Sequence, residues 1–171
     1  MAWLVVTGYM GAGKSTVGAA VAARLGVRFV DLDDEISARS EMTIPQIFAR
    51  KGELWFRRTE ERVVRELMAE EPPGVLALGG GALESTKTRS LLARSPAVVW
   101  LRPSTDVAWS RVRGSDRPLA TDRDRFARRA ASREAGYREA SDIEIDADAP
   151  LADVVERVLA FASQHVVGAS G

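Results

Sequence analysis

The sequence predicts an α/β fold with three layers, in which helices cover both faces of a central, five-stranded parallel sheet. Short apolar runs alternate with amphipathic segments along the chain, which is the pattern of parallel strands joined by helical crossovers. A glycine-rich loop follows the first apolar run and precedes an amphipathic segment. The chain has 171 residues, 46% of them hydrophobic and 28% charged, which is the composition of one folded domain.

Five apolar runs have the length of strands. The longest continuous ones, Trp3–Val6 and Val98–Leu101, fall far below the roughly 20 residues that a membrane-spanning helix requires. The expected strands are Trp3–Thr7, Arg28–Val30, Val75–Leu78, Ala97–Leu101 and Asp142–Ile145.

Eight segments between the strands predict helices, and several of their ends carry residues that start or stop a helix. Gly26 suits a C-cap, and Pro72 blocks continuation of the longest helix. Thr121 or Asp122 can cap the seventh helix, and Pro150 suits the start of the last. The expected helices are Ser15–Leu25, Leu32–Arg39, Ile44–Lys51, Glu53–Glu70, Ser85–Ala93, Ser104–Val112, Asp122–Glu139 and Leu151–Ser163. We expect one domain over 1–165 and a frayed tail over 166–171.

The composition excludes several kinds of chemistry. Cysteine is absent, so disulfides and cysteine-based metal or redox sites are impossible, and the single histidine, His165, argues against histidine-cluster zinc sites and Ser-His-Asp catalysis. Basic and acidic residues balance at 24 each, which gives no support to nucleic acid or membrane as partners. The N-terminal residues lack the basic and small-residue pattern of a signal peptide, so we expect a cytoplasmic protein.

The glycine-rich loop, Gly8–Ser15, matches the phosphate-binding pattern G-x-x-x-x-G-K-[ST]. Its glycines let consecutive amides face a phosphate at a helix N-terminus. Lys14, one of only three lysines, is expected to reach the β- and γ-phosphates, and the Ser15 hydroxyl to bind Mg²⁺. The predicted ATP-binding residues of the loop are Gly11, Ala12, Gly13, Lys14, Ser15 and Thr16.

Carboxylates follow the second expected strand. Asp31 and Asp33 would emerge at the ligand-binding edge of the sheet, where one can hold Mg²⁺ through water and the other can accept a hydrogen bond from a substrate hydroxyl. The alternative is an acidic helix start, which we favour for Asp34 and Glu35.

Further motifs resemble the shikimate kinase family, a P-loop family related to the nucleoside-monophosphate kinases. After Gly8–Thr16 and Val30–Asp33 come the segments Gly52–Glu60 and Leu78–Ala82, then Arg117-Pro118-Leu119 and Tyr137-Arg138, in the family's order. The resemblance covers about residues 3–160. It implies transfer of the γ-phosphoryl of MgATP to the 3-hydroxyl of shikimate, with a substrate-binding region at about 32–62 and a lid at about 112–125.

The resemblance also implies roles for individual residues. Arg57 and Arg138 would bind the carboxylate of shikimate, for which arginine offers a bidentate fork. Asp33 would take the hydroxyls near the reacting oxygen, and Glu60 could orient Arg57 from one helical turn away. The glycines Gly79, Gly80 and Gly81 would let backbone amides approach the substrate. Lys14, Asp33 and Arg117 would be the catalytic residues, with Arg117 beside the transferring phosphoryl group and also on ATP.

The segment from Arg102 to Arg138 holds ten arginines against five acidic residues. We expect Arg111 or Arg113 to flank the adenine, together with the loop Asp146–Pro150. The arginines of the seventh helix are interpreted as a solvated face, namely Arg123, Arg125, Arg128 and Arg129. Departures from the family's commonest pattern occur at Leu78, Ala120 and Trp55.

The sequence leaves two alternatives open. One is a sibling kinase of another small polyol acid, such as gluconate or an aminoshikimate. The other is a regulatory module that binds nucleotide without turnover, against which the predicted acceptor residues argue. We expect a monomer with ATP and shikimate as small-molecule partners, Mg²⁺ as the cofactor, and neither nucleic acid nor membrane as a partner.

Overall fold

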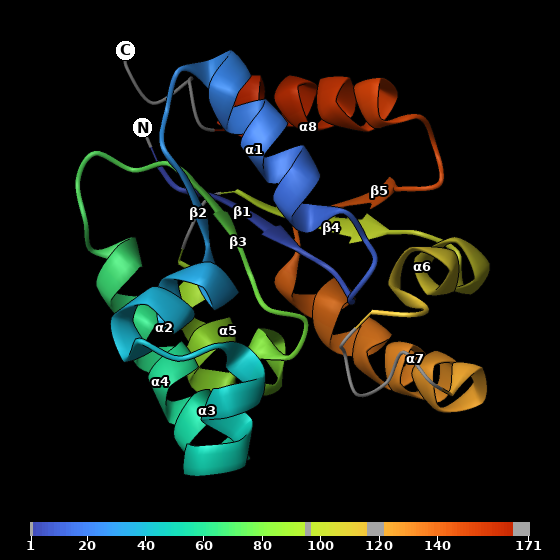
Figure 1. Ribbon diagram of the computed structural model, residues 1–171. Helices are drawn as coiled ribbons and strands as arrows, with labels where there is room; N and C mark the ends of the chain where they lie inside the picture. The colour runs from blue at the N-terminus through green and yellow to red at the C-terminus, as the bar shows by residue number, and fades with distance from the viewer. Residues whose placement is uncertain (1, 95–96, 116–121, 166–171) are drawn as a thin grey trace.

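The computed structural model describes residues 2–94, 97–115 and 122–165. Its five strands form one sheet in the order β2-β3-β1-β4-β5, and all neighbours are parallel (Figure 1). The strands are β1 (Leu4–Thr7), β2 (Phe29–Asp31), β3 (Val75–Ala77), β4 (Val98–Arg102) and β5 (Ile143–Asp146). The predicted fold class is therefore confirmed.

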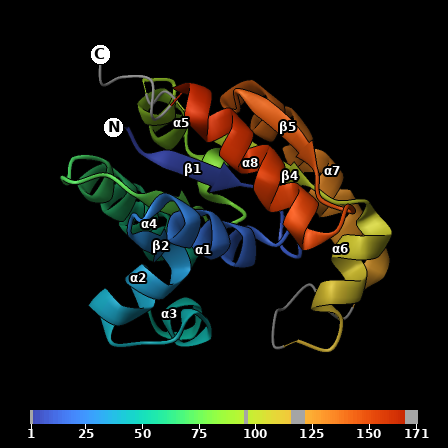
Figure 2. The same cartoon turned by 90° about the horizontal axis from the view of Figure 1, so that it is seen from above.

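Helices cover both faces of this sheet. On one face lie α1 (Lys14–Leu25) and α8 (Leu151–His165), side by side in Figures 1 and 2 and joined by an ion pair between Arg24 and Glu156. Below the sheet in Figure 1 lie α2 (Leu32–Ser40), α3 (Ile44–Lys51), α4 (Glu53–Met68), α5 (Thr86–Leu92) and α7 (Arg123–Ala140). A short 3₁₀ turn, η1 (Ala82–Glu84), precedes α5, and α6 (Thr105–Val112) follows β4.

The strands bury side chains on both faces, and alternate residues serve different cores. Val5 and Leu76 pack into the core beneath α2, α4 and α7, whereas Leu4, Val6 and Val75 pack against α1 and α8. This alternation explains the continuous apolar runs, because a strand covered on both faces needs no polar positions. No helix in the described part of the chain is long and apolar enough to span a membrane.

The expected elements are all present, with ends displaced by at most two residues. Gly26 caps α1 with φ of 67°. Of the two candidates for the cap of α7, Asp122 accepts a hydrogen bond from the Arg125 amide at 3.0 Å. Ser85 and Ser104 were expected inside helices but are the N-caps of α5 and α6. The expected tail, 166–171, lies outside the described residues.

Candidate active site

The glycine-rich loop joins β1 to the N-terminus of α1. Gly13 immediately precedes the helix with φ of 86°, a left-handed conformation that glycine adopts without strain. The first amides of α1 have no partner within the helix and are suited to bind phosphate oxygens. Lys14 is the first helical residue, and its Nζ donates a hydrogen bond to the carbonyl oxygen of Tyr9 at 3.1 Å. The predicted phosphate-binding residues thus lie at one helix start.

Asp31 connects this loop to the acceptor side. It is the last residue of β2 and the N-cap of α2, where its Oδ1 accepts a hydrogen bond from the Asp33 amide at 3.0 Å. Its other oxygen accepts a hydrogen bond from the Ser15 hydroxyl. Hard oxygen donors of this kind suit Mg²⁺ that is also held by phosphates. Among the described residues, no cluster of three or more histidine, cysteine, aspartate or glutamate side chains could hold a metal ion by itself.

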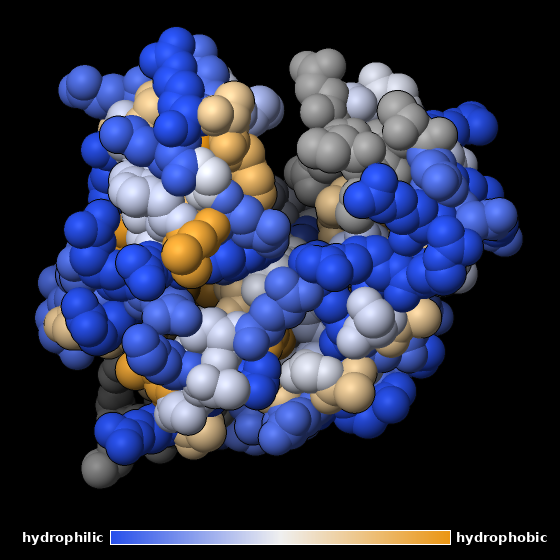
Figure 3. Space-filling view, turned by 90° about the horizontal axis from the view of Figure 1, so that it is seen from below, coloured by the Kyte–Doolittle hydropathy of each residue, from blue (hydrophilic) through white to orange (hydrophobic). Residues whose placement is uncertain are grey.

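A cleft of about 850 Å³ lies between α3 and α4 on one side and α7 on the other, and Figure 3 shows the face on which it opens. Its apolar wall includes Ile44, Pro45 and Phe48 of α3 together with Phe56 of α4. The expected acceptor residues Asp33, Arg57 and Gly79–Gly81 also line it. A Cβ atom at Gly80 would lie 3.6 Å from the Met10 amide nitrogen, so the glycine triplet adjoins the phosphate loop.

Arg57 is held in this cleft by a buried glutamate. Its Nη1 donates to Glu60 Oε1 at 2.9 Å, which is the contact expected from their spacing on α4. The Glu60 side chain is only 3% exposed. Burial raises the pKa of Glu60 to about 7, Arg57 opposes the rise, and the Asp33 carboxylate adds to it. The pair therefore places a guanidinium in the cleft with one edge already fixed.

The glycine triplet is required by close approach. A Cβ atom at Gly79 would lie 2.9 Å from Asp33 Oδ1 and 2.9 Å from Glu60 Oε2, and one at Gly81 would lie 2.5 Å from the Arg57 guanidinium. Such distances are shorter than real Cβ contacts. Both carboxylates and the guanidinium thus lie directly against the backbone of this loop, which only glycine permits.

Arg138, expected on the substrate carboxylate, lies elsewhere. Its side chain is 62% exposed, and its guanidinium lies 4.0 Å from Glu144 and over the ring of Trp100. Arg133 occupies the cleft instead, with a side chain only 10% exposed, a hydrogen bond to Glu84 at 3.1 Å and its guanidinium over the ring of Tyr9.

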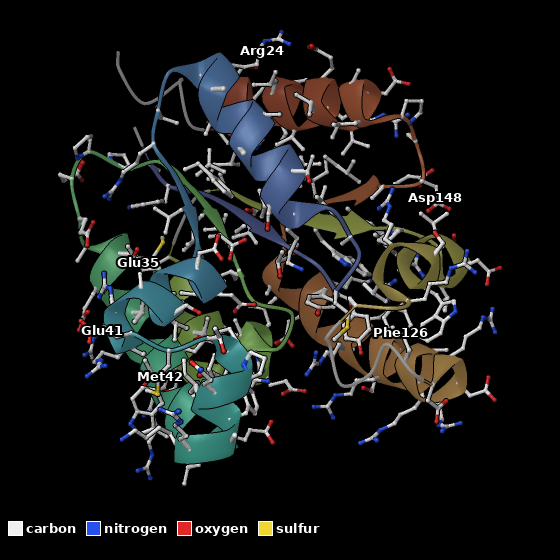
Figure 4. The ribbon with its side chains drawn as sticks, in the orientation of Figure 1. Arg24, Glu35, Glu41, Met42, Phe126 and Asp148 are labelled. Carbon is white, nitrogen blue, oxygen red and sulfur yellow. The ribbon has the colours of Figure 1, made fainter. Side chains whose placement is uncertain are left out.

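Helical spacing explains why Arg133 takes this place. It lies seven residues after Phe126 and four before Tyr137, the two buried anchors of α7, so all three share one helix face. Phe126, labelled in Figure 4, packs against Tyr9 of the phosphate loop and Trp109 of α6. Arg138, one residue after Tyr137, therefore faces away. The sequence analysis missed Arg133, and its spacing from these two anchors is the signal that could have identified it.

The interpretation of the seventh-helix arginines as a solvated face agrees with the exposure of all four, but it did not foresee that three of them also line the acceptor cleft. Arg125, Arg128 and Arg129 line the cleft, and Arg129 lies 3.2 Å from Glu84. Arg123 does lie outside it, in an ion pair with Asp106. The alternation of arginine with aspartate and alanine along this helix did not indicate that the apolar side chains of α3 would lie opposite it.

A second, smaller pocket of about 210 Å³ opens beside Gly13 and Thr16. Arg111 lines it and donates hydrogen bonds to the carbonyl oxygens of Gly11 at 2.9 Å and Ala147 at 3.1 Å. Arg113 is an exposed residue at the end of α6 and is not part of this lining. Of the two candidates for flanking adenine, Arg111 is thus the one beside the phosphate loop.

Other expected residues have different positions. Arg117 and Ala120 lie outside the described residues, as does the rest of the segment 116–121. Leu78 is buried in the core, and Trp55 packs partly buried against the same core. Neither lines the acceptor cleft, so these two departures from the family pattern leave its lining unchanged.

A family model for shikimate kinase matches residues 10–163. The chain belongs to the shikimate kinase family. A shikimate kinase from Ruegeria pomeroyi is 43% identical over 162 residues, covering 92% of this chain and 83% of the relative. One from Bradyrhizobium diazoefficiens is 41% identical over 169 residues, covering 96% and 81%.

Solved structures agree with this family assignment. A shikimate kinase from Acinetobacter baumannii in complex with shikimate superposes with a TM-score of 0.87 at 32% identity, covering 100% of this chain and 96% of that one. A gluconokinase from Sinorhizobium meliloti has a TM-score of 0.61 at 22% identity, covering 95% and 92%, which shows a shared fold alone. The predicted family and the predicted ATP-dependent kinase activity are confirmed.

Proposed function

We propose that this member of the shikimate kinase family transfers the γ-phosphoryl group of MgATP to the 3-hydroxyl of shikimate, giving shikimate 3-phosphate and ADP. The observation that carries the proposal is a cleft with two partly buried arginines, Arg57 and Arg133, that opens onto the phosphate loop at Met10. The arginines suit a carboxylate, and the neighbouring loop suits the phosphates of ATP.

Arg57 and Arg133 would bind the carboxylate from two sides of the cleft. Glu60 holds one guanidinium and Glu84 the other before substrate arrives, so little side-chain freedom is lost on binding. We assign Arg133 the role that the family resemblance implied for Arg138. The amides of Gly79, Gly80 and Gly81 would meet the ring hydroxyls where the absent side chains leave room.

Asp33 would position the attacking hydroxyl. It follows Asp31 at the start of α2, and its Oδ1 lies at the glycine loop. In a loose phosphoryl-transfer transition state, early removal of the hydroxyl proton contributes little, so the main effect of Asp33 is orientation. The proton passes to the carboxylate as the new oxygen–phosphorus bond forms.

The phosphate side would stabilise charge. Amides of Gly11, Ala12 and Gly13, together with Ser15 and Thr16, would bind the phosphates, and Lys14 would bridge the β- and γ-oxygens. Mg²⁺ would be held by Ser15 directly and by Asp31 through water, and when bound it neutralises the phosphate oxygens. We keep Arg117 as a further charge-stabilising residue on ATP, on the strength of its motif, and Arg111 as the residue that flanks adenine.

We further propose one domain over 1–165 that acts as a cytoplasmic monomer on small molecules, without nucleic acid or membrane as a partner. Within it, residues 32–62 would bind the acceptor, and a lid at about 112–125 would exclude water, which would otherwise compete for the phosphoryl group. The two buried cores pack against the faces of a single sheet, which supports one cooperative unit.

A coupled assay of ADP release, run with a panel of acceptors, tests this function. We expect turnover with shikimate and far less with gluconate, because the apolar wall at Ile44 and Phe48 suits a compact ring rather than an open chain. Arg57→Ala should raise the shikimate KM strongly and leave the ATP KM nearly unchanged. Turnover with another acid and none with shikimate would refute the acceptor assignment. ATP binding without any turnover would favour the regulatory module.

A further inference from the structure

The arginines on α7 bring more positive charge into the cleft than one carboxylate requires. Arg125, Arg128, Arg129 and Arg133 all line it, and Arg57 adds a fifth guanidinium from α4. The carboxylates in the lining are three, namely Asp33, Asp34 and Glu60. The cleft of a chain with no net charge is therefore locally positive.

Ion pairs divide these arginines into two groups. Arg129 and Arg133 both contact Glu84, at 3.2 Å and 3.1 Å. Arg125 and Arg128 are exposed, and within the described ranges neither side chain has an ion pair or a hydrogen bond. No acidic side chain of the described residues pairs with them, so their charge is available to act on an anion that enters the cleft.

The wall across the cleft strengthens this effect. Ile44, Pro45 and Phe48 of α3 are apolar, and Phe48 is 38% exposed. Low-dielectric walls concentrate field lines within a cleft and raise the local concentration of an oppositely charged ligand. An acidic α3 would have cancelled much of the field from α7.

We propose that Arg125 and Arg128 capture the anionic acceptor at the mouth of the cleft by long-range attraction, before Arg57 and Arg133 bind its carboxylate. The inference rests on the proposed function, since it needs a negatively charged acceptor. Two unit charges about 10 Å from the path of a monovalent anion in water raise its local concentration about fourfold. Salt weakens the attraction, because the Debye length falls from about 10 Å at 0.1 M to about 3 Å at 1 M.

The test is the double variant Arg125→Gln/Arg128→Gln, assayed from 20 mM to 1 M salt. We expect kcat/KM for shikimate to fall about two- to threefold at 20 mM salt, where screening already weakens the attraction, and to approach that of the unmodified protein at 1 M. The single variant Arg128→Gln, which lies outside the lid range, should leave kcat and the KM for ATP unchanged, because this residue does not touch the reacting atoms.

The matched control is Arg62→Gln/Arg65→Gln. These residues are also exposed, on α4, but line a separate groove with Arg94, so the variant removes the same number of charges from outside the acceptor cleft, although Arg62 lies 4.0 Å from Glu66. An equal fall in kcat/KM in this control would show a net-charge effect and refute capture. A fall in kcat of Arg128→Gln, or an unchanged kcat/KM of the α7 double variant, would refute it too. Failure of the unmodified protein to phosphorylate shikimate refutes the proposed function and this inference together. Normal turnover with unchanged kcat/KM refutes the inference alone.

Discussion

Glu60→Gln tests how the acceptor cleft holds a buried carboxylate. One oxygen of Glu60 is bonded to Arg57, and the other, Oε2, has no hydrogen-bond partner in the described structure. Burial raises the pKa of Glu60 from 4.5 to about 7, with Arg57 opposing the shift and Asp33 adding to it. Glutamine keeps the shape and an oxygen for Arg57 but cannot ionise.

The effect on stability follows from proton linkage. Below pH 4.5 the carboxyl is protonated in the folded and the unfolded chain alike. Between pH 4.5 and 7 the unfolded chain releases a proton that the folded chain retains, so the free energy of unfolding falls as the pH rises. At about 1.4 kcal/mol per pKa unit, the loss between pH 5 and pH 8 is about 2.5 kcal/mol. The Glu60→Gln variant does not show this pH-dependent loss, because glutamine does not titrate.

Thermal and urea unfolding at pH 5 and pH 8 measure the difference. Between pH 5 and pH 8, the free energy of unfolding of Glu60→Gln should rise by about 2.5 kcal/mol relative to that of the unmodified protein. For a chain of this size, this corresponds to roughly 5–10 °C in Tm. Glu139→Gln, at an exposed position on α7, serves as the control and should gain little. Unfolding free energies of the Glu60 variant and the unmodified protein that run parallel with pH would refute the reasoning.

Three further substitutions test the assigned site. Arg133→Ala should raise the shikimate KM about 10- to 100-fold through loss of charged hydrogen bonds. Arg138→Ala, on the outer face of α7, should change this KM less than about twofold. Equal KM values in the two variants would contradict the assignment of carboxylate binding to Arg133 in place of Arg138. Gly79→Ala should lower kcat/KM more than about tenfold, because its methyl group would lie 2.9 Å from two carboxylates. Gly136→Ala, with open space around it, should instead raise the free energy of unfolding by about 0.5–1 kcal/mol. A fully active Gly79 variant would show that the loop shifts freely. Asp31→Asn keeps the cap of α2 but should raise the Mg²⁺ needed for half-maximal rate about tenfold; an unchanged Mg²⁺ titration would remove Asp31 from the metal site.

Local chemistry made the phosphate loop and most element ends predictable. The pattern at Gly8–Ser15 sets a strand, a turn and a helix start within a few residues, so it specifies its structure without help from distant contacts. Asp31 shows that two interpretations of one residue can both be valid. It caps α2, as an acidic helix start would, and it also bonds to the Ser15 hydroxyl.

The acceptor-binding residues were harder to predict, because they depend on which side of α7 faces the sheet. Arg133 and Arg138 are five residues apart, so they point to different sides of the helix. Choosing between them required knowing that Phe126 and Tyr137 face inward. The position of Arg125 and Arg128 in a cleft also depended on α3, a distant segment whose approach no local pattern encodes.

The balanced charge of the chain and its charged cleft have one physical origin. Before substrate binds, a guanidinium in a partly buried cleft needs an acidic partner, because an unpaired buried charge lowers the stability of the fold. Arg57 therefore pairs with Glu60, and Arg133 pairs with Glu84. In the net charge of the chain, each of these positive charges is balanced by the negative charge of its partner. Of the five arginines that line the cleft, only Arg125 and Arg128 have no acidic partner among the described residues, and they can remain so because they are exposed to water. A count of charges sums these pairs to zero, whereas an incoming anion meets the arginines at the mouth first.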